Sequence, residues 1–267
     1  MNKLINQAIF IIAIILIFSN FLLKPKETTT DKKLEINNID ISNNNPSEAN
    51  KKNLNNLLIV KEEYFLSYNC SKGIANWVGW RTSESDLGDL SRSDDFREDN
   101  SLPKKCYQVD EKDYRGSGYD RGHLMPSGDR TKSKQANSSS FLMINMIPQH
   151  KANNREVWRE LEQHSRQLIE EGLTLHSFAG GIGQIKTISD GKITVPEYVW
   201  KVVLIENKIS GEVDAIAVIM PNNESVRKTD WTDYLTTVDK VEEVTGYDFF
   251  SYLIDDVESE IESKVYQ

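Results

Sequence analysis

The sequence predicts an α+β fold in which a central sheet is flanked by helices. Strand-like segments form two groups, at residues 57–82 and 175–221, and several of them are almost entirely apolar. Nearly continuous apolar runs are typical of strands in the interior of a sheet. One amphipathic helix is expected between the two groups and short helices after them, a mixture that indicates the α+β class.

The first group holds three short segments that are rich in β-branched and aromatic residues. They are LLIV (57–60), YFLSY (64–68) and ANWVGWRT (75–82), and each is expected to form a strand. Residues 86–100 are polar and are expected to form a loop. The apolar run FLMINMIP (141–148) is expected to be buried and to end at Pro148.

A helix is expected from about Arg155 to Glu171. Apolar or small residues recur there at helical spacing, at Val157, Trp158, Leu161, Ser165, Leu168 and Ile169. Asn153-x-x-Glu156 resembles a capping box at the N-terminus. Gly172 stands where a helix commonly ends.

The second group of strands precedes the C-terminal helices. The segments LHSFAGG (175–181), KITVP (192–196), YVWKVVLIE (198–206) and DAIAVIMP (214–221) are expected to be strands. Residues 238–245 and 248–254 are expected to form short helices.

The N-terminus indicates export. Residues 1–26 carry Lys3 and then an apolar run from Ala8 to Leu23, which is typical of a signal peptide or a signal anchor. The run is short for a membrane span, so the expected product is either secreted or periplasmic, or tethered to a membrane through residues 8–23. Residues 27–56 are rich in Asn, Thr, Lys, Ser and Glu and are expected to form a flexible linker. The folded domain is then expected at residues 57–267.

Charge is distributed unevenly along a chain whose net charge is −9. Residues 239–267 hold nine acidic residues against Lys240 and Lys264, whereas residues 111–134 hold six basic against four acidic residues. A locally basic segment of this kind is compatible with an anionic substrate. Cys70 and Cys106 are the two cysteines, and after export they would either form one disulfide or stay as two thiols.

Four polar residues suggest a catalytic site. His123 lies in the sequence DRGH, Asn145 lies inside the apolar run, Asn154 lies near the start of the expected helix, and Glu162 follows two helical turns later on the same face. An Asn oxygen beside a carboxylate suits a hard cation that keeps most of its water, such as Mg²⁺ or Mn²⁺. A neutral histidine and a cation together could hydrolyse a phosphodiester, with an arginine stabilising the transition state.

Each of these residues also has an ordinary structural interpretation. A single histidine in a loop is more often solvated than catalytic, Asn154 could cap a helix, Glu162 could be solvated, and Asp120 could simply pair with Arg121. Asn145 is harder to explain in this way, because a buried amide needs partners. The ordered combination favours a site over the separate structural roles.

The segments YRGSGYDRGHLMPSGDR and FLMINMIPQHKANNREVWRELE together resemble the sugar-non-specific DNA/RNA endonucleases, a ββα-metal family that includes exported bacterial nucleases and endonuclease G. The shared pattern is DRGH, then N-x-x-P-Q, then N-x-x-x-W-x-x-[LM]-E, and the likeness extends over roughly residues 58–264. The resemblance implies a mainly antiparallel sheet with helices on both faces and a ββα-metal motif. A general base at His123 and one divalent cation held by Asn154 are implied as well.

The resemblance also implies roles for the surrounding residues. Asn145 is expected to orient the site, Glu162 to hold its water or polar network, and Arg97 to stabilise the transition state, although Arg92 is close in sequence. Asp120 and Arg121 complete the motif in supporting roles. Further basic residues are expected to bind substrate, namely Arg115, Arg130 and Lys132.

The sequence therefore predicts an exported, metal-dependent endonuclease that cuts DNA and RNA without strong sequence preference and leaves 5′-phosphate ends. Single- and double-stranded nucleic acids are the expected substrates, and an inhibitor protein is a conceivable partner. The alternatives are a membrane-tethered module that captures nucleic acid without cutting it and a hydrolase of small phosphodiesters.

Overall fold

The computed structural model describes residues 44–267, so the expected leader at residues 1–26 and most of the expected linker lie outside the described residues. None of the helices in the described part of the chain is both long and apolar enough to cross a membrane.

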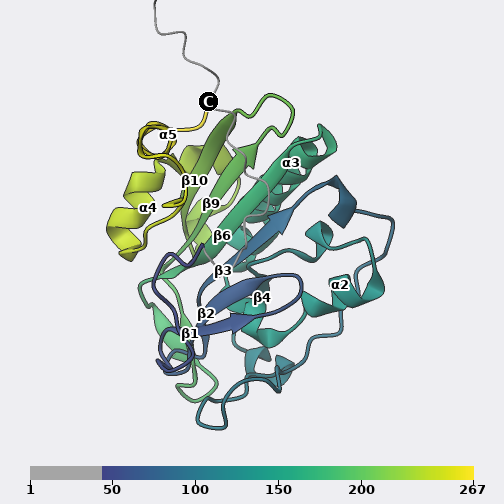
Figure 1. Ribbon diagram of the computed structural model, residues 1–267. Coiled ribbons are helices and arrows are strands. Elements are labelled where there is room, and N and C mark those ends of the chain that lie inside the picture. The colour runs from purple at the N-terminus through teal and green to yellow at the C-terminus, as the bar shows by residue number, and fades with distance from the viewer. Residues whose placement is uncertain (1–43) are drawn as a thin grey trace, which may run out of the picture. The chain divides into compact units, whose positions relative to one another are not determined.

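A seven-stranded sheet forms the centre of the described fold (Figure 1), in the order β1-β2-β3-β6-β9-β10-β11, and every neighbouring pair is antiparallel. The strands are β1 (Leu57–Val60), β2 (Phe65–Asn69), β3 (Ile74–Thr82), β6 (Thr174–Ile182), β9 (Tyr198–Glu206), β10 (Val213–Pro221) and β11 (Leu235–Thr236). The expected α+β class with a mainly antiparallel sheet is confirmed.

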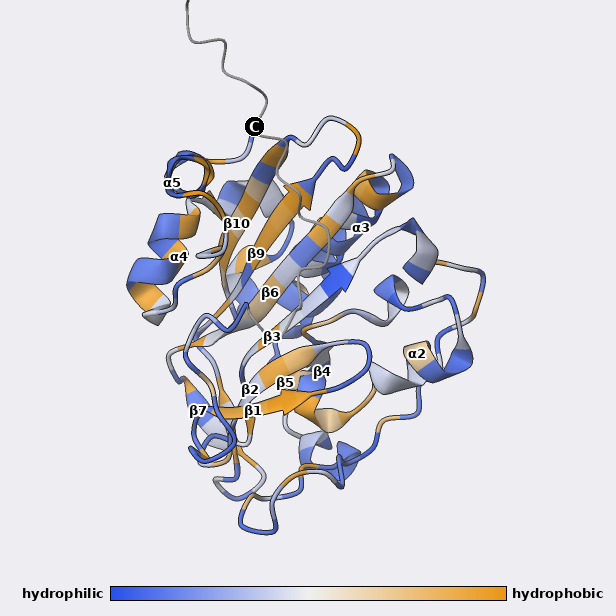
Figure 2. Cartoon of the chain, viewed as in Figure 1, coloured by the Kyte–Doolittle hydropathy of each residue, from blue (hydrophilic) through white to orange (hydrophobic). Residues whose placement is uncertain are grey.

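The inner strand β9, which lies between β6 and β10, shows that both faces of the sheet are covered. Eight of its nine residues are buried, and much of the strand is coloured hydrophobic in Figure 2. Successive side chains on a strand point to opposite faces. Trp200 packs against Phe249 in the C-terminal segment, whereas Lys201 lies over the ring of Trp158 at the start of α3. The two faces are therefore covered by different parts of the chain.

The α-helices lie around this sheet. They are α2 (Lys134–Ser139), α3 (Trp158–Glu170), α4 (Val238–Thr245) and α5 (Asp255–Glu262). Helix α3 continues directly from a π-helical turn, Asn153–Val157, and ends before Gly172, whose φ of 90° suits a helix C-terminus. Short 3₁₀ turns occur at Glu84–Asp86, Glu111–Tyr114, Ser127–Asp129, Met143–Asn145, Glu224–Val226 and Trp231–Tyr234.

Two small antiparallel sheets complete the described fold. Strands β7 (Lys186–Ile188) and β8 (Ile193–Val195) form one of them, and β4 (Asp120–His123) and β5 (Met146–Gln149) form the other. In the second sheet His123 pairs with Met146 and Asp120 pairs with Gln149. This hairpin-like pair followed by the helix at 153–170 is the ββα unit that was expected around the DRGH sequence.

The boundary of the packed domain differs from the one expected at residue 57. Ala49 is buried, Ser47 Oγ accepts a hydrogen bond from Trp77 Nε1 at 2.8 Å, and Asn56 Oδ1 accepts one from Ser67 Oγ at 2.6 Å. Residues 44–56 therefore pack onto the sheet. The composition suggested a linker because asparagine and serine side chains, rather than apolar ones, hold this segment.

Two expectations about helix ends are wrong. Residues 248–254 are not helical, since Phe249, Phe250 and Leu253 are buried and Phe250 has a φ of 58°, and the helix begins only at Asp255. The expected capping box at Asn153 is also absent: the Asn153 side chain bonds to Gln149 and to the Pro221 carbonyl, while Glu156 pairs with Arg227.

Cys70 and Cys106 form a disulfide across a sequence separation of 36 residues. Of the two alternatives left open by the sequence, the paired one is therefore observed. The bond ties the end of β2 to the loop that precedes β4, the strand that carries His123.

Candidate active site

A close contact between Gly122 and the Gln149 side chain holds strand β4, which carries His123, against β5. Gly122 faces the side chain of Gln149, and a Cβ atom built on Gly122 would lie 2.0 Å from Gln149 Oε1 and 2.6 Å from Gln149 Cβ. Only glycine fits this contact. The glycine of DRGH and the glutamine of the N-x-x-P-Q segment are thus two halves of one packing contact, which sets the register of β4 against β5.

The imidazole of His123 is buried between two aromatic rings. Its ring centroid lies 5.6 Å from that of Phe96 and 4.9 Å from that of Phe141, both in edge-to-face geometry. Only 7% of the residue is exposed, and its Nε2 has no hydrogen-bond partner among the described residues. Burial, and then the charges of Arg92 and Arg121, lower the pKa of His123 to about 3. The side chain is therefore neutral at pH 7.

The same two aromatic rings hold two arginines. The guanidinium of Arg121 lies 4.0 Å from the ring centroid of Phe96, and that of Arg92 lies 4.8 Å from the centroid of Phe141. Cation–π contacts at these distances position the charges without neutralising them. Arg92 also pairs with Asp94 and Arg121 pairs with Glu111. Two cationic groups thus lie near enough to the histidine to act on its charge.

Asn145 holds the chain that follows His123. Its Oδ1 accepts a hydrogen bond from the Met125 amide at 2.9 Å, and its Nδ2 donates to the carbonyls of Met125 and Ser140, both at 2.8 Å. The side chain is fully buried, and both of its polar atoms form hydrogen bonds with backbone groups. Asn145 therefore holds the loop that follows His123 and lines neither of the pockets around that residue.

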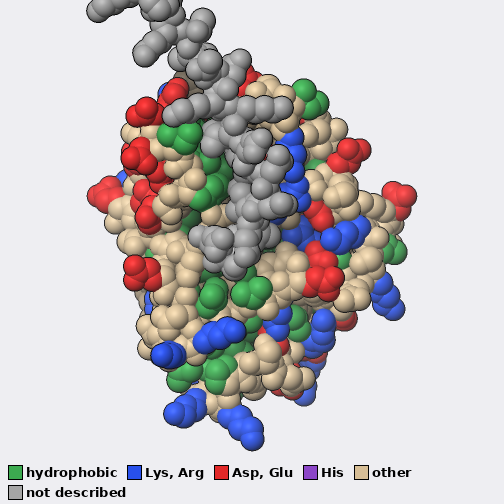
Figure 3. Space-filling view, in the orientation of Figure 1, with side chains coloured by type: hydrophobic (Ala, Val, Ile, Leu, Met, Phe, Trp, Pro, Cys, Tyr) green, Lys and Arg blue, Asp and Glu red, His purple; other side chains and the backbone are tan. Residues whose placement is uncertain are grey.

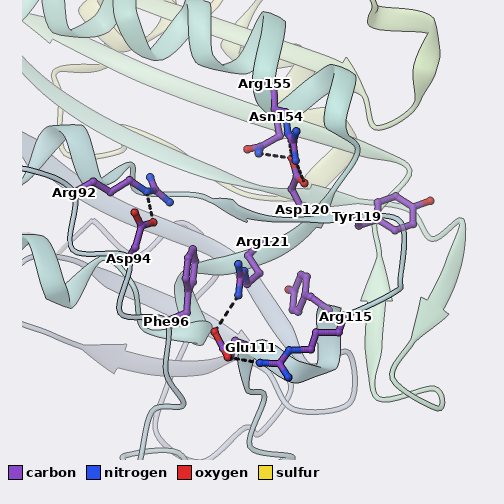
Figure 4. Close-up of a pocket in the computed structure, with 11 residues that line it drawn as sticks. Arg92, Asp94, Phe96, Glu111, Arg115, Tyr119, Asp120, Arg121, Asn154 and Arg155 are labelled. Carbon is purple, nitrogen blue, oxygen red and sulfur yellow. Dashed lines mark hydrogen bonds and ion pairs between the residues drawn. The ribbon is translucent and has the colours of Figure 1, made fainter.

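Asn154 presents one oxygen to the site because its amide nitrogen is occupied. Its Nδ2 donates to Asp120 Oδ2 at 3.0 Å, and Asp120 also pairs with Arg155 through two bonds of 2.7 and 2.8 Å (Figure 4). Asn154 lies in the π-helical turn rather than at a helix cap. Such turns often occur at functional sites, because they rotate a side chain out of the regular helical position. Among the described residues nothing donates to Asn154 Oδ1.

Glu162 lies about two helical turns after Asn154 and close to the charges of Lys201 and Arg166. Burial raises the pKa of Glu162, and the positive charges of Lys201 and Arg166 oppose that shift. Lys201 is 2% exposed and lies over the rings of Trp158 and Trp80. Burial lowers the pKa of Lys201, while Glu162 acts in the opposite direction. The two groups therefore support each other's charged form in a site of low polarity.

These residues line two neighbouring pockets that share Arg92, Arg121 and Asn154. The inner pocket holds His123 and Glu162, together with Arg159 and Arg166. The outer pocket, drawn in Figure 4, holds Asp120 and Arg155 together with Arg115, Tyr119 and Phe96. Basic side chains outnumber acidic ones by four to one in the inner pocket and by four to three in the outer pocket, so the paired pockets form a cleft suited to a polyanion.

Besides Asn145, the structure places three predicted residues outside this cleft. Arg97 lines neither pocket, since its Nη1 is held by Asp95 and by the Ser138 carbonyl. Arg92, rather than Arg97, lines both pockets near His123. The two arginines are five residues apart in a polar loop, and only the fold shows which of them turns toward His123.

Arg130 is the clearest correction among the expected substrate-binding residues. It is 2% exposed, pairs with buried Glu63 at 2.8 Å and donates to the carbonyls of Glu63 and Arg81. Lys132 pairs with Glu63 and Asp86 and also lies outside both pockets. Both therefore support the fold. Arg115 does line the outer pocket and stays largely exposed, as expected for a substrate contact.

One supporting residue gives no signal in the sequence. Asn222 is fully buried; its Oδ1 accepts from the His150 amide at 2.6 Å, and its Nδ2 donates to the carbonyls of Pro148 and Pro196. It thereby holds the chain between β5 and the helix that carries Asn154. Its position after an apolar strand resembles that of an ordinary turn residue, so only its contacts reveal this role.

Comparisons with known proteins agree with the geometry. A family model described as "DNA/RNA non-specific endonuclease" matches residues 41–256, a range that includes the packed segment at 44–56. A nuclease from a Nostoc species is 44% identical over 230 residues, covering 83% of this chain and 84% of the relative. Human mitochondrial endonuclease G is 30% identical over 200 residues, covering 70% of this chain and 67% of the relative.

A solved structure matches the fold. A chain in the crystal structure of the EndoG/EndoGI complex aligns with a TM-score of 0.67 at 24% identity, covering 74% of this chain and 86% of that chain. At this identity the match supports the fold alone.

Proposed function

The chain belongs to the DNA/RNA non-specific endonuclease family, and we propose that it cleaves both polymers at His123 with the help of one divalent cation held by Asn154. The observation that carries this proposal is the cleft itself. A buried neutral histidine, an amide oxygen without a donor and two arginines converge there from segments 30 to 60 residues apart in the sequence.

The residues fit a hard cation such as Mg²⁺ or Mn²⁺. The bond from Asn154 Nδ2 to Asp120 leaves Oδ1 as the atom available for coordination, and oxygen is the ligand that such cations prefer. Glu162 lines the same pocket and is suited to accept hydrogen bonds from water around the cation. When bound, the cation would neutralise charge on the phosphate and on the leaving oxygen.

His123 is suited to remove a proton from the attacking water. A base must be unprotonated before it can act, and burial together with two arginines keeps His123 neutral. The approach of an anionic phosphodiester would offset the charges of Arg92 and Arg121 and so raise the basicity of the imidazole. The same arginines would stabilise the extra negative charge of the transition state. Water forms the new bond to phosphorus and the P–O3′ bond breaks, so the phosphate stays on the 5′ oxygen of the downstream fragment and the upstream fragment ends in a 3′ hydroxyl.

The lack of sequence preference has a physical basis in the cleft. Its cationic groups are arginines that can reach phosphates, and contacts to phosphates carry no base information. The disulfide between Cys70 and Cys106 supports the proposal that the domain works outside the cytoplasm, because disulfides persist in oxidising compartments.

Plasmid and RNA cleavage by the full chain test the proposal. Wild type and His123→Ala would each be incubated with supercoiled plasmid and with RNA, in Mg²⁺ and in EDTA. Cleavage of both polymers by wild type alone, abolished by EDTA, is the expected result. Equal cleavage by the variant would remove His123 from the role of base, and binding of nucleic acid without cleavage by either protein would favour a capture module. The 5′ ends of the products are checked by labelling with and without prior phosphatase treatment.

A further inference from the structure

Three carboxylates meet between the last two helices. Asp239 and Glu242 lie on one face of α4, and Glu262 is the final residue of α5. One oxygen from each of the three lies within 4.8 Å of the others. Figure 3 shows acidic side chains gathered over the edge of the molecule where these two helices lie.

The nearby lysines do not neutralise this cluster. Lys240 pairs with Glu243, and Lys264 pairs with Glu260. These are the two basic residues of the segment 239–267. No ion pair in the described residues joins a lysine or arginine to Asp239, Glu242 or Glu262.

Glu262 is the member that most needs a partner. It is 7% exposed, and its Oε1 is buried without a hydrogen-bond partner among the described residues. An unpaired buried carboxylate is costly, so the cluster requires either a proton or a cation.

We propose that Asp239, Glu242 and Glu262 bind one Ca²⁺ ion that clamps α4 to α5. Oxygens coordinating Ca²⁺ lie about 2.3–2.6 Å from the ion, so oxygens on opposite sides are about 5 Å apart, and the observed limit of 4.8 Å fits this shell. Three carboxylates supply the oxygen-rich, negatively charged environment that Ca²⁺ prefers, and the flexible shell of Ca²⁺ tolerates water in the remaining positions. Mg²⁺ requires a tighter octahedron.

This site is separate from the catalytic cleft. Helices α4 and α5 cover the sheet beside β9 and β10, on the face where Trp200 meets Phe249, whereas the helix carrying Asn154 lies on the opposite face with Lys201. Occupation of the cluster would therefore stabilise the C-terminal helices without supplying a group to the reaction.

Calcium binding by the full chain carrying Asn154→Ala tests this proposal, because that substitution removes the ligand proposed for the catalytic cation. Isothermal titration with CaCl₂ from about 10 μM to 10 mM covers the dissociation constants of extracellular calcium modules, about 10⁻⁴–10⁻³ M. We expect one Ca²⁺ per chain and a rise of several degrees in the unfolding temperature, as for any ligand that binds only the folded state. A folded protein that shows neither response would overturn the proposal.

Glu262→Gln and Glu260→Gln, each added to Asn154→Ala, form a matched pair. Both remove one charge from α5, but Glu260 is exposed and paired with Lys264. We expect Glu262→Gln to weaken Ca²⁺ binding at least about tenfold and Glu260→Gln to change it by less than about twofold. Equal effects of the two substitutions would overturn the proposal, because Ca²⁺ binding would then follow the total negative charge of α5 and not the three-carboxylate cluster. If Glu262→Gln fails to fold, Glu242→Gln against Glu243→Gln makes the same comparison on α4.

Discussion

Asn154 Nδ2 donates to Asp120 Oδ2 at 3.0 Å, and this bond joins the DRGH sequence to a helix 34 residues later. It also fixes the orientation of an amide, since a carboxylate can only accept and the nitrogen must therefore face it. The oxygen of Asn154 is left for the cleft. Asp120 thus determines which atom of Asn154 the site can use.

Asp120→Ala is expected to raise the Mg²⁺ concentration needed for half-maximal cleavage about tenfold or more, the usual scale for the loss of a residue that orients a metal ligand. Arg155→Ala is the control, because it removes the ion pair with Asp120 while the bond from Asn154 remains. It should move the Mg²⁺ midpoint by less than about threefold. Metal titrations of plasmid cleavage measure both, and equal shifts would contradict the orienting role.

Arg92 and Arg97 can be distinguished by kinetics. Arg92→Ala is expected to reduce kcat/KM by about a hundredfold, the scale for losing one transition-state donor, because Arg92 lines both pockets. Arg97→Ala should cost less than about fivefold, since Arg97 is bound to Asp95 and the Ser138 carbonyl. The reverse order would restore Arg97 to the role that the sequence suggested.

The lowered pKa of His123 gives a pH prediction for activity. The acidic limb of kcat/KM, which reports the free enzyme, is expected well below the usual histidine value of 6.5, because burial and then Arg92 and Arg121 disfavour the protonated ring. Arg121→Gln removes one of these charges and should move the limb toward higher pH, even though total activity falls. An unmoved limb would show that His123 does not set it.

The same shift predicts a change in stability with pH. The folded-state pKa of about 3 lies below the unfolded value, so the unfolded chain binds the proton more strongly and stability falls as pH drops from about 6.5 toward 3. His123→Gln cannot titrate, and its free energy of unfolding should therefore decline less over this range. Urea unfolding at pH 7, 5.5 and 4.5 measures the two slopes, and identical slopes would contradict the prediction.

Arg130→Ala is expected to affect folding rather than binding. It breaks the buried pair with Glu63 and leaves only the partly exposed Lys132 beside that carboxylate, and breaking a buried pair costs about 3–5 kcal/mol. Arg115→Ala is the comparison: it should weaken substrate binding and leave stability nearly unchanged, because Arg115 is exposed in the outer pocket. Thermal unfolding and KM for plasmid DNA separate the two effects. A raised KM with unchanged stability in the Arg130 variant would reinstate it as a substrate contact.

Reduction of the disulfide should destabilise the fold. Opening a cross-link between Cys70 and Cys106 restores freedom to the unfolded chain, an effect of about 3–4 kcal/mol for a loop of this length. Cys70→Ala/Cys106→Ala is expected to unfold at a lower temperature than wild type, and dithiothreitol should lower the midpoint of wild type but not that of the double variant. Equal midpoints for all samples would show that the link does not stabilise the domain.

The sequence by itself determined the features that depend on residues close together in the chain, namely the strands and the motif around His123. The apolar runs predicted β1, β9 and β10 to within a residue, because short apolar runs rich in β-branched residues favour strands. The order DRGH, N-x-x-P-Q and N-x-x-x-W-x-x-L-E predicted that His123, Asn145, Asn154 and Glu162 belong together. The structure brings three of these to one pocket and places Asn145 behind it.

The tertiary structure alone decided what depends on contacts between distant segments. Arg92 rather than Arg97 faces the histidine because Phe141, some fifty residues away, stacks beneath its guanidinium. Arg130 became a buried structural residue because Glu63 pairs with it across the fold. Residues 44–56 pack through side-chain hydrogen bonds to Trp77 and Ser67, which leave no apolar pattern. A local sequence pattern indicates which residues prefer burial. The partner of a charged side chain depends instead on which distant segments the fold brings next to it.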